Sequence, residues 1–205
     1  MTNLGFVHRF VSATRQDCPV TLLLLHGTGG NEEDLLPLGQ ALLPGAALLS
    51  PRGNVLENGM PRFFRRLAEG VFDIDDLKKR TRELAVFLEA ARKEYHLEGK
   101  LIAAGYSNGA NIASSLMLLY PGLLAGGVLL RPMVPFVPAE PPDLQGTRVL
   151  LAGGKRDRIV PLEQTGELAR ILEQAGAGVE LHWHEGGHEL GQDDVDAARR
   201  WLAAP

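Results

Sequence analysis

Short aliphatic runs alternate with longer amphipathic stretches along most of this 205-residue chain. An apolar run without alternation is typical of a strand buried on both faces, as in a parallel sheet covered by helices. We expect such strands at 20–25, 46–49, 101–104, 127–130, 148–151 and 179–183, with an edge strand at 6–11. The pattern predicts an α/β fold with a mostly parallel central sheet and helices on both faces.

The amphipathic stretches between these runs predict the helices. Asp73 suits the capping position of a helix whose apolar stripe runs from Ile74 to Tyr95. Further helices are expected over 108–120, from Pro161 to just before Gly176, and over 193–202. The proline-rich stretch 132–142 indicates a loop, and no long helical insertion predicts a large cap. We expect a single domain over residues 1–205.

The composition argues against several classes of function. Hydrophobic residues make up 45% and charged residues 22% of the chain, and the formal net charge is −4. The charges are spread along the sequence, so no basic stripe indicates nucleic-acid binding. No apolar run approaches the roughly 20 residues that span a bilayer, and the first residues lack a signal-peptide core. Cys18 alone can form no intramolecular disulfide, so we expect a cytoplasmic protein that binds neither nucleic acid nor a membrane.

The segment Gly105-Tyr106-Ser107-Asn108-Gly109 lies between a predicted strand and a predicted helix. A serine at such a sharp turn needs small neighbours, because the backbone is strained and packs closely against the next helix. The turn lifts the hydroxyl out of the sheet and places a helix N-terminus beneath it, where developing negative charge is favoured. The pattern therefore predicts that Ser107 is a nucleophile, provided that the rest of a hydrolytic site follows.

A serine nucleophile needs a base to take its proton and a carboxylate to orient that base. Asp157 follows the strand expected at 148–151, and His188 follows the one at 179–183. Their order along the chain is that of an α/β-hydrolase site, and glycines beside each give the loops freedom to reach the sheet edge. We expect Asp157 and His188 to complete the site, in preference to Asp143 and Glu185.

The oxyanion of such a reaction needs two fixed hydrogen-bond donors. One is expected from the backbone N–H of Asn108, immediately after the nucleophile. The other is expected from the N–H of Thr28, within the glycine-rich loop that follows Leu25.

Together these motifs resemble the phospholipase/carboxylesterase family of α/β-hydrolases. The resemblance rests on segments from Leu25 to His188: Leu25-His26-Gly27-Thr28-Gly29-Gly30, Ser50-Pro51-Arg52-Gly53, Gly105-Tyr106-Ser107-Asn108-Gly109, Asp157 with Val160-Pro161, and Gly187-His188. It implies an α/β-hydrolase fold over nearly the whole chain and hydrolysis of small-molecule carboxylic esters or thioesters through an acyl-enzyme. It implies no cofactor and makes a homodimer reasonable. The residues of the Thr28 and Ser107 motifs are closer to those of bacterial carboxylesterases than to those of acyl-protein thioesterases.

Four apolar residues are candidates for the substrate pocket: Met60, Phe63, Phe64 and Met133. Met and Phe side chains suit an acyl or aromatic group, and we expect esters of short to medium acyl chains or aromatic esters. The segment around Phe63 and Phe64 is equally compatible with a loop that tucks both rings into the core.

Four further alternatives have to be weighed at this stage. The same residues would also suit a thioesterase, or a non-catalytic binder of small molecules with this fold. His182 and His184 could join His188 in a metal cluster, but no metal is expected, because His188 already has a role. His26 is expected to brace its loop through a backbone hydrogen bond and not to act as the base.

Overall fold

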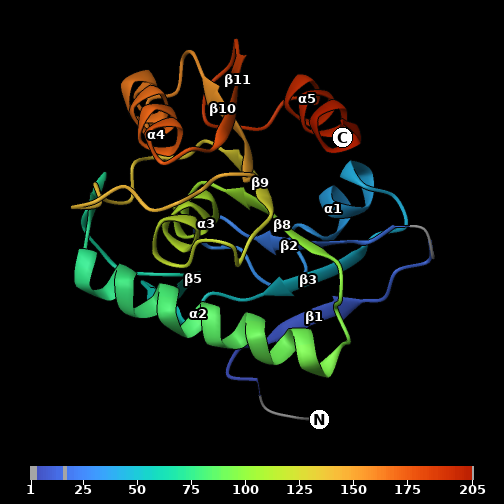
Figure 1. The fold of residues 1–205 in the computed structure, drawn as a ribbon. Helices are drawn as coiled ribbons and strands as arrows, with labels where there is room; N and C mark the ends of the chain where they lie inside the picture. Colours follow the sequence, from blue (N-terminus) through green and yellow to red (C-terminus); the bar gives the residue numbers. More distant parts are fainter. Residues whose placement is uncertain (1–3, 16–17, 205) are drawn as a thin grey trace.

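The computed structural model describes residues 4–15 and 18–204 of the chain. Seven strands form the central sheet, in the order β1-β3-β2-β8-β9-β10-β11 (Figure 1). Every neighbouring pair is parallel except β1 with β3, so β1 is the antiparallel edge strand. The strands are β1 (His8–Val11), β2 (Val20–Leu25), β3 (Ala47–Pro51), β8 (Lys100–Tyr106), β9 (Gly126–Leu130), β10 (Arg148–Gly154) and β11 (Gly178–His184).

Helices cover both faces of this sheet (Figure 1). They are α1 (Leu36–Leu42), α2 (Ile74–Glu94), α3 (Asn108–Leu119), α4 (Leu162–Gln174) and α5 (Gln192–Ala203). Buried residues of α2, α3 and α4 form one apolar cluster with one face of the strands, and α1 and α5 join a second cluster on the other face. This arrangement confirms the predicted sheet and its coverage, and the described residues include no large cap.

The predicted elements agree with the structure to within a few residues. Val20–Leu25 is a strand as expected, and Asp73 caps α2 by accepting a hydrogen bond from the backbone N–H of Asp76 at 3.1 Å. Residues 132–142 contain no helix or strand, as the proline-rich composition predicted. Among the described residues, no helix combines the length and the apolar content needed to cross a membrane.

Five short elements were not predicted. They are α1 and two hairpins, β4 (Val55–Glu57) with β5 (Met60–Arg62), and β6 (Arg66–Ala68) with β7 (Val71–Phe72). Both hairpins lie between β3 and α2 in the chain. Because β3 is parallel to β2 and β8, these hairpins start from the sheet edge where all three strands end, which is the edge that carries Ser107.

Candidate active site

Ser107 occupies a strained turn between β8 and α3. Its φ is 52° and its ψ is −113°, a backbone conformation that non-glycine residues rarely adopt. The neighbouring strand β9 holds the backbone of this turn, because the Ser107 N–H donates to the Leu130 carbonyl at 2.8 Å. The glycine two residues later is required by space, since a Cβ on Gly109 would lie 1.9 Å from the Leu25 carbonyl oxygen. The local structure is the strand-to-helix turn that the sequence predicted.

Ser107, His188 and Asp157 form a continuous chain of hydrogen bonds. The Ser107 hydroxyl lies 3.0 Å from Nε2 of His188, and Nδ1 of His188 lies 2.7 Å from Oδ2 of Asp157. The other oxygen of Asp157 accepts from the backbone N–H groups of Ile159 and Val160, at 2.8 and 3.0 Å. A carboxylate can only accept, so Nδ1 of His188 carries a proton and Nε2 is free to accept from the hydroxyl. This arrangement can remove a proton from Ser107.

The rival acidic residues have other partners. The Asp143 carboxylate accepts from the backbone N–H of Gln145 at 3.0 Å, and Glu185 pairs with Lys155 at 2.5 Å. Of the acidic residues that the structure describes, Asp157 is the one that bonds the imidazole of His188.

His182 and His184, the two candidates for a metal cluster with His188, lie beside acidic residues of α5. His184 Nδ1 lies 2.8 Å from the Asp193 carboxylate, and Nε2 of His182 lies 3.4 Å from it. His184, Asp193 and Asp194 are the described residues whose ligand atoms come close enough to hold a metal ion, and His182 is not one of them. Both oxygens of Asp194 already accept hydrogen bonds from Arg131, and the group does not include His188.

Thr28 and Asn108 place two free backbone N–H groups beside Ser107. Asn108 is the first residue of α3, and Thr28 lies in the loop that follows β2. Neither N–H donates to another protein group in the described part of the chain. Both residues line the same cavity as Ser107. Two unused donors at this position suit a developing oxyanion.

Arg62, which is not among the predicted site residues, braces the Thr28 loop. It is buried, and its Nη1 donates to the Thr28 hydroxyl at 3.0 Å. Its Nε donates to the Phe64 carbonyl at 3.2 Å, and Glu57 lies 3.1 Å away as the ion-pair partner. Burial lowers the pKa of Arg62 from its ordinary value, and the carboxylate of Glu57 opposes that shift.

Two adjoining cavities open beside Ser107. The inner one has a volume of about 40 Å³ and the outer one about 340 Å³. Thr28, Ser107 and Ile159 line both. Met133 lines the inner cavity, as its candidate role requires, whereas His188 lines the outer one.

Phe63 and Phe64 require a correction. The rings are 2% and 0% exposed, they belong to the apolar core, and they line neither cavity beside Ser107. The core alternative therefore describes them: both follow the end of β5, Phe63 packs on the His26 ring, and Phe64 packs on the Phe72 ring. Met60 is 40% exposed and lines neither cavity; its sulfur lies beside Gly29 in the Thr28 loop.

His26 braces the same loop, as predicted. It is buried, its Nε2 accepts from the backbone N–H of Gly53 at 3.0 Å, and its Nδ1 lies 2.7 Å from the Gly27 carbonyl. A neutral imidazole with its proton on Nδ1 satisfies both contacts. Burial lowers the pKa of His26 below the ordinary histidine value, despite the opposing effect of the Gly27 carbonyl.

This lowered pKa of His26 predicts a pH dependence of stability. In the unfolded chain the imidazole takes up a proton near pH ~6.5, whereas in the folded state it does so only at a lower pH. The stabilisation is therefore complete above pH ~6.5 and is lost as the pH falls towards the folded pKa, by at most about 1.4 kcal/mol per pH unit. Urea unfolding of wild type and His26→Gln between pH 7.5 and 5.5 measures the difference, with the exposed His96→Gln as control. Identical pH profiles for wild type and His26→Gln would contradict it.

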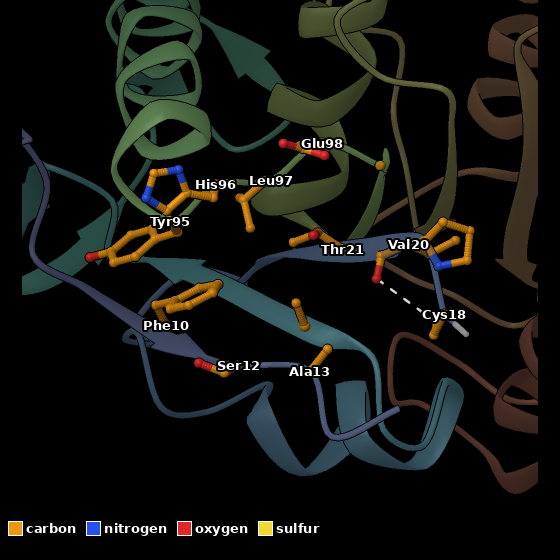
Figure 2. Close-up of a pocket in the computed structure, with 13 residues that line it drawn as sticks. Phe10, Ser12, Ala13, Cys18, Val20, Thr21, Tyr95, His96, Leu97 and Glu98 are labelled. Atoms are coloured by element: carbon orange, nitrogen blue, oxygen red, sulfur yellow. Dashed lines mark hydrogen bonds between the residues drawn. The ribbon is translucent and has the colours of Figure 1, made fainter. Parts of the chain in front are cut away.

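A separate cavity of about 250 Å³ lies at the amino ends of β2, β3 and β8, whereas Ser107 lies at the carboxyl ends of the strands (Figure 2). Phe10, Cys18, Tyr95 and Glu98 are among its lining residues, and Cys18 lies near the Val20 carbonyl at the amino end of β2. None of the predicted site residues lines this cavity. It is separated from Ser107 by the length of the strands.

Known proteins are similar to this chain over most of its length. A family model described as phospholipase/carboxylesterase matches residues 7–204. The chain is 53% identical over 181 residues to the putative hydrolase MhqD of Bacillus subtilis, covering 88% of this chain and 90% of that protein.

Solved structures give the same result. The crystal structure of the Bacillus cereus carboxylesterase superposes with a TM-score of 0.93 at 50% identity, over 97% of this chain and 94% of that one. A carboxylesterase from Mesorhizobium loti superposes with a TM-score of 0.92 at 34% identity, over 100% and 98% of the two chains. The predicted α/β-hydrolase fold is thereby confirmed.

Proposed function

Because the chain belongs to the phospholipase/carboxylesterase family, we propose that it hydrolyses carboxylic esters through an acyl-enzyme formed on Ser107. One observation carries the proposal: the hydrogen bonds that run unbroken from Ser107 through His188 to Asp157. A protein that only binds a small molecule has no need of a base aligned on a strained serine.

In the first half of the reaction Ser107 Oγ attacks the ester carbonyl carbon, and its proton moves to Nε2 of His188. The carbonyl oxygen becomes an oxyanion that accepts hydrogen bonds from the N–H groups of Thr28 and Asn108. Each such donor is worth about 2.7–4 kcal/mol in the transition state. The bond to the alcohol oxygen then breaks, and that oxygen takes the proton from His188.

In the second half a water molecule attacks the acyl carbon. His188 Nε2 accepts a proton from the water, and the bond between the acyl carbon and Ser107 Oγ breaks. That oxygen takes the proton back, which releases the acid and restores the starting state. The buried carboxylate of Asp157 stabilises the imidazolium in both halves.

The two cavities divide the substrate between them. The leaving alcohol must lie near His188, which donates its proton, and His188 lines only the outer cavity. The acyl group therefore occupies the inner cavity, whose size of about 40 Å³ admits only a few heavy atoms. We infer a short acyl group joined to an alcohol part that is less restricted in size.

Met133→Ala is expected to lengthen the preferred acyl chain. Met133 is 9% exposed and closes one wall of the inner cavity, next to the position that a Cβ on Gly70 would take. Each methylene gained in such a pocket is worth about 10-fold or more in discrimination. The kcat/KM ratio for p-nitrophenyl octanoate over p-nitrophenyl acetate should therefore rise about 10-fold or more. Met117→Ala, a buried methionine away from the site, should lower stability and leave the ratio unchanged; a similar rise there would contradict the assignment.

Labelling with a fluorophosphonate tests the proposed function directly. The wild-type protein should gain one adduct, and mass spectrometry of the digested protein should place it on Ser107. A folded protein without an adduct would support the non-catalytic alternative instead. Matched oxygen esters and thioesters of acetate then decide between the carboxylesterase and the thioesterase alternatives.

A further inference from the structure

Three successive backbone carbonyls around His188 each accept a hydrogen bond from a side chain. Arg131 Nε donates to the Gly187 carbonyl at 3.1 Å, and Arg131 Nη2 donates to the Glu189 carbonyl at 2.7 Å. Between them, the Tyr106 hydroxyl donates to the carbonyl of His188 itself at 3.0 Å. The loop that carries the base is thus held on both sides and at its centre.

Arg131 reaches this loop from an unusual backbone position. It follows β9 directly, its side chain is fully buried, and its φ of 56° lies in the region that favours glycine. Its backbone N–H and its Nη1 both contact the Ala152 carbonyl, at 2.7 and 3.3 Å. A glycine would fit this backbone more easily but would supply none of the side-chain donors.

Asp194 balances the buried charge of Arg131. Its two oxygens accept from Nη1 and Nη2, at 3.0 and 2.7 Å. One of them also accepts from the backbone N–H of Gly191 at the start of α5, at 2.9 Å. A bidentate pair of this kind fixes the plane of the guanidinium as well as its position. The donors that face Gly187 and Glu189 are therefore held rigidly.

Tyr106 connects the same loop to the other parts of the site. It precedes Ser107 in the chain, and its ring centre lies 5.4 Å from that of His188. The ring also packs against Gly27, where an added Cβ would lie 2.9 Å from it. Burial raises the pKa of the Tyr106 hydroxyl, so it remains a donor at neutral pH.

We propose that Arg131 and Tyr106 are positioning residues that hold the backbone of 187–189 so that Nε2 of His188 stays aligned on the Ser107 hydroxyl. This inference rests on the proposed function. Neither residue touches the reacting atoms: Arg131 acts through the carbonyls of Gly187 and Glu189, and the Tyr106 hydroxyl acts through the carbonyl of His188. A displacement of about 1 Å at a reacting group can cost about 10²-fold in rate, so a modest loosening of this loop lowers kcat more than it changes KM.

Tyr106→Phe and Arg131→Lys test the proposal. The first removes one donor and keeps the ring; the second keeps a positive charge for Asp194 and loses the planar fork. With p-nitrophenyl acetate, each should lower kcat about 10-fold and change KM less than about twofold. The rate of fluorophosphonate labelling should fall in parallel, and hydrogen exchange should quicken at residues 187–190.

Two matched variants control for loss of stability alone. Tyr95→Phe removes a hydroxyl that contacts His8, and Arg92→Lys removes donors to the carbonyls of Leu97 and Gly99. Both controls lie at the opposite edge of the sheet and should lower Tm without lowering kcat or the labelling rate.

The outcomes are distinguishable. Wild-type values of kcat and labelling rate in both Tyr106→Phe and Arg131→Lys would overturn the positioning role while leaving the proposed function intact. If Arg131→Lys does not fold, Tyr106→Phe decides alone, because it leaves the pair of Arg131 with Asp194 untouched. A wild-type protein that gains no adduct would overturn the proposed function, and the positioning role with it.

Discussion

Ser107→Ala is expected to lower kcat for p-nitrophenyl acetate by about 10⁶-fold and to abolish fluorophosphonate labelling. The substitution removes the atom that attacks the carbonyl carbon. The N–H groups of Thr28 and Asn108 remain, so a residual rate above that of the uncatalysed reaction is expected. A loss smaller than about 100-fold would mean that Ser107 is not the nucleophile.

The same position offers a control for folding. The Ser107 hydroxyl bonds His188, whereas the backbone N–H bonds Leu130 and is kept by any substitution except proline. The φ of 52° favours glycine over alanine. Ser107→Gly should therefore be as inactive as Ser107→Ala but more stable, by about 1 kcal/mol in urea unfolding. Equal inactivity in two variants of different stability separates loss of chemistry from loss of fold.

The aliphatic runs were sufficient to predict the sheet, because strands buried on both faces leave an unbroken apolar signature. Val20–Leu25 is the clearest example, since five of its six residues are buried. The order of Ser107, Asp157 and His188 was predictable for a related reason: each follows a strand that such a signature marks. In parallel strands the carboxyl ends meet at one edge, so residues far apart in sequence converge there.

The hairpins between β3 and α2 were missed for different reasons. Asn58-Gly59 joins β4 to β5 with φ values of 51° and 79°, which is the turn that this dipeptide favours. That signal was present in the sequence, and it would have separated Phe63 and Phe64 from the exposed Met60. The hairpin of β6 with β7 has strands of three and two residues, too short to show a period.

The supporting arginines could not have been found from local pattern. Arg131 follows a buried strand and bonds carbonyls more than 50 residues away along the chain, at Gly187 and Glu189. Arg62 is buried beside Thr28, although arginine in a hairpin is usually solvated. Nothing in the neighbouring residues indicates which distant groups such a guanidinium will meet, since backbone acceptors are present in every segment.

Asp157→Asn is expected to lower kcat by about 10⁴-fold while changing the volume at the site very little. The fall in kcat is expected because two backbone N–H groups, those of Ile159 and Val160, donate to Oδ1. They will hold the amide oxygen of the asparagine at that place, which leaves its NH₂ group facing Nδ1 of His188. A donor there forces Nδ1 to accept, so the proton of the neutral imidazole moves to Nε2.

A protonated Nε2 cannot accept the proton of Ser107. The activity is therefore lost because His188 is in the wrong tautomer, and not because its side chain has moved. Crystals of Asp157→Asn should accordingly show His188 in its wild-type place, while steady-state assays with p-nitrophenyl acetate show the loss. Asp143→Asn is the matched control, because that exposed carboxylate bonds the nearby backbone of Gln145 and should leave kcat unchanged. A fall of less than about tenfold in Asp157→Asn would mean that the carboxylate does not set the tautomer of the base.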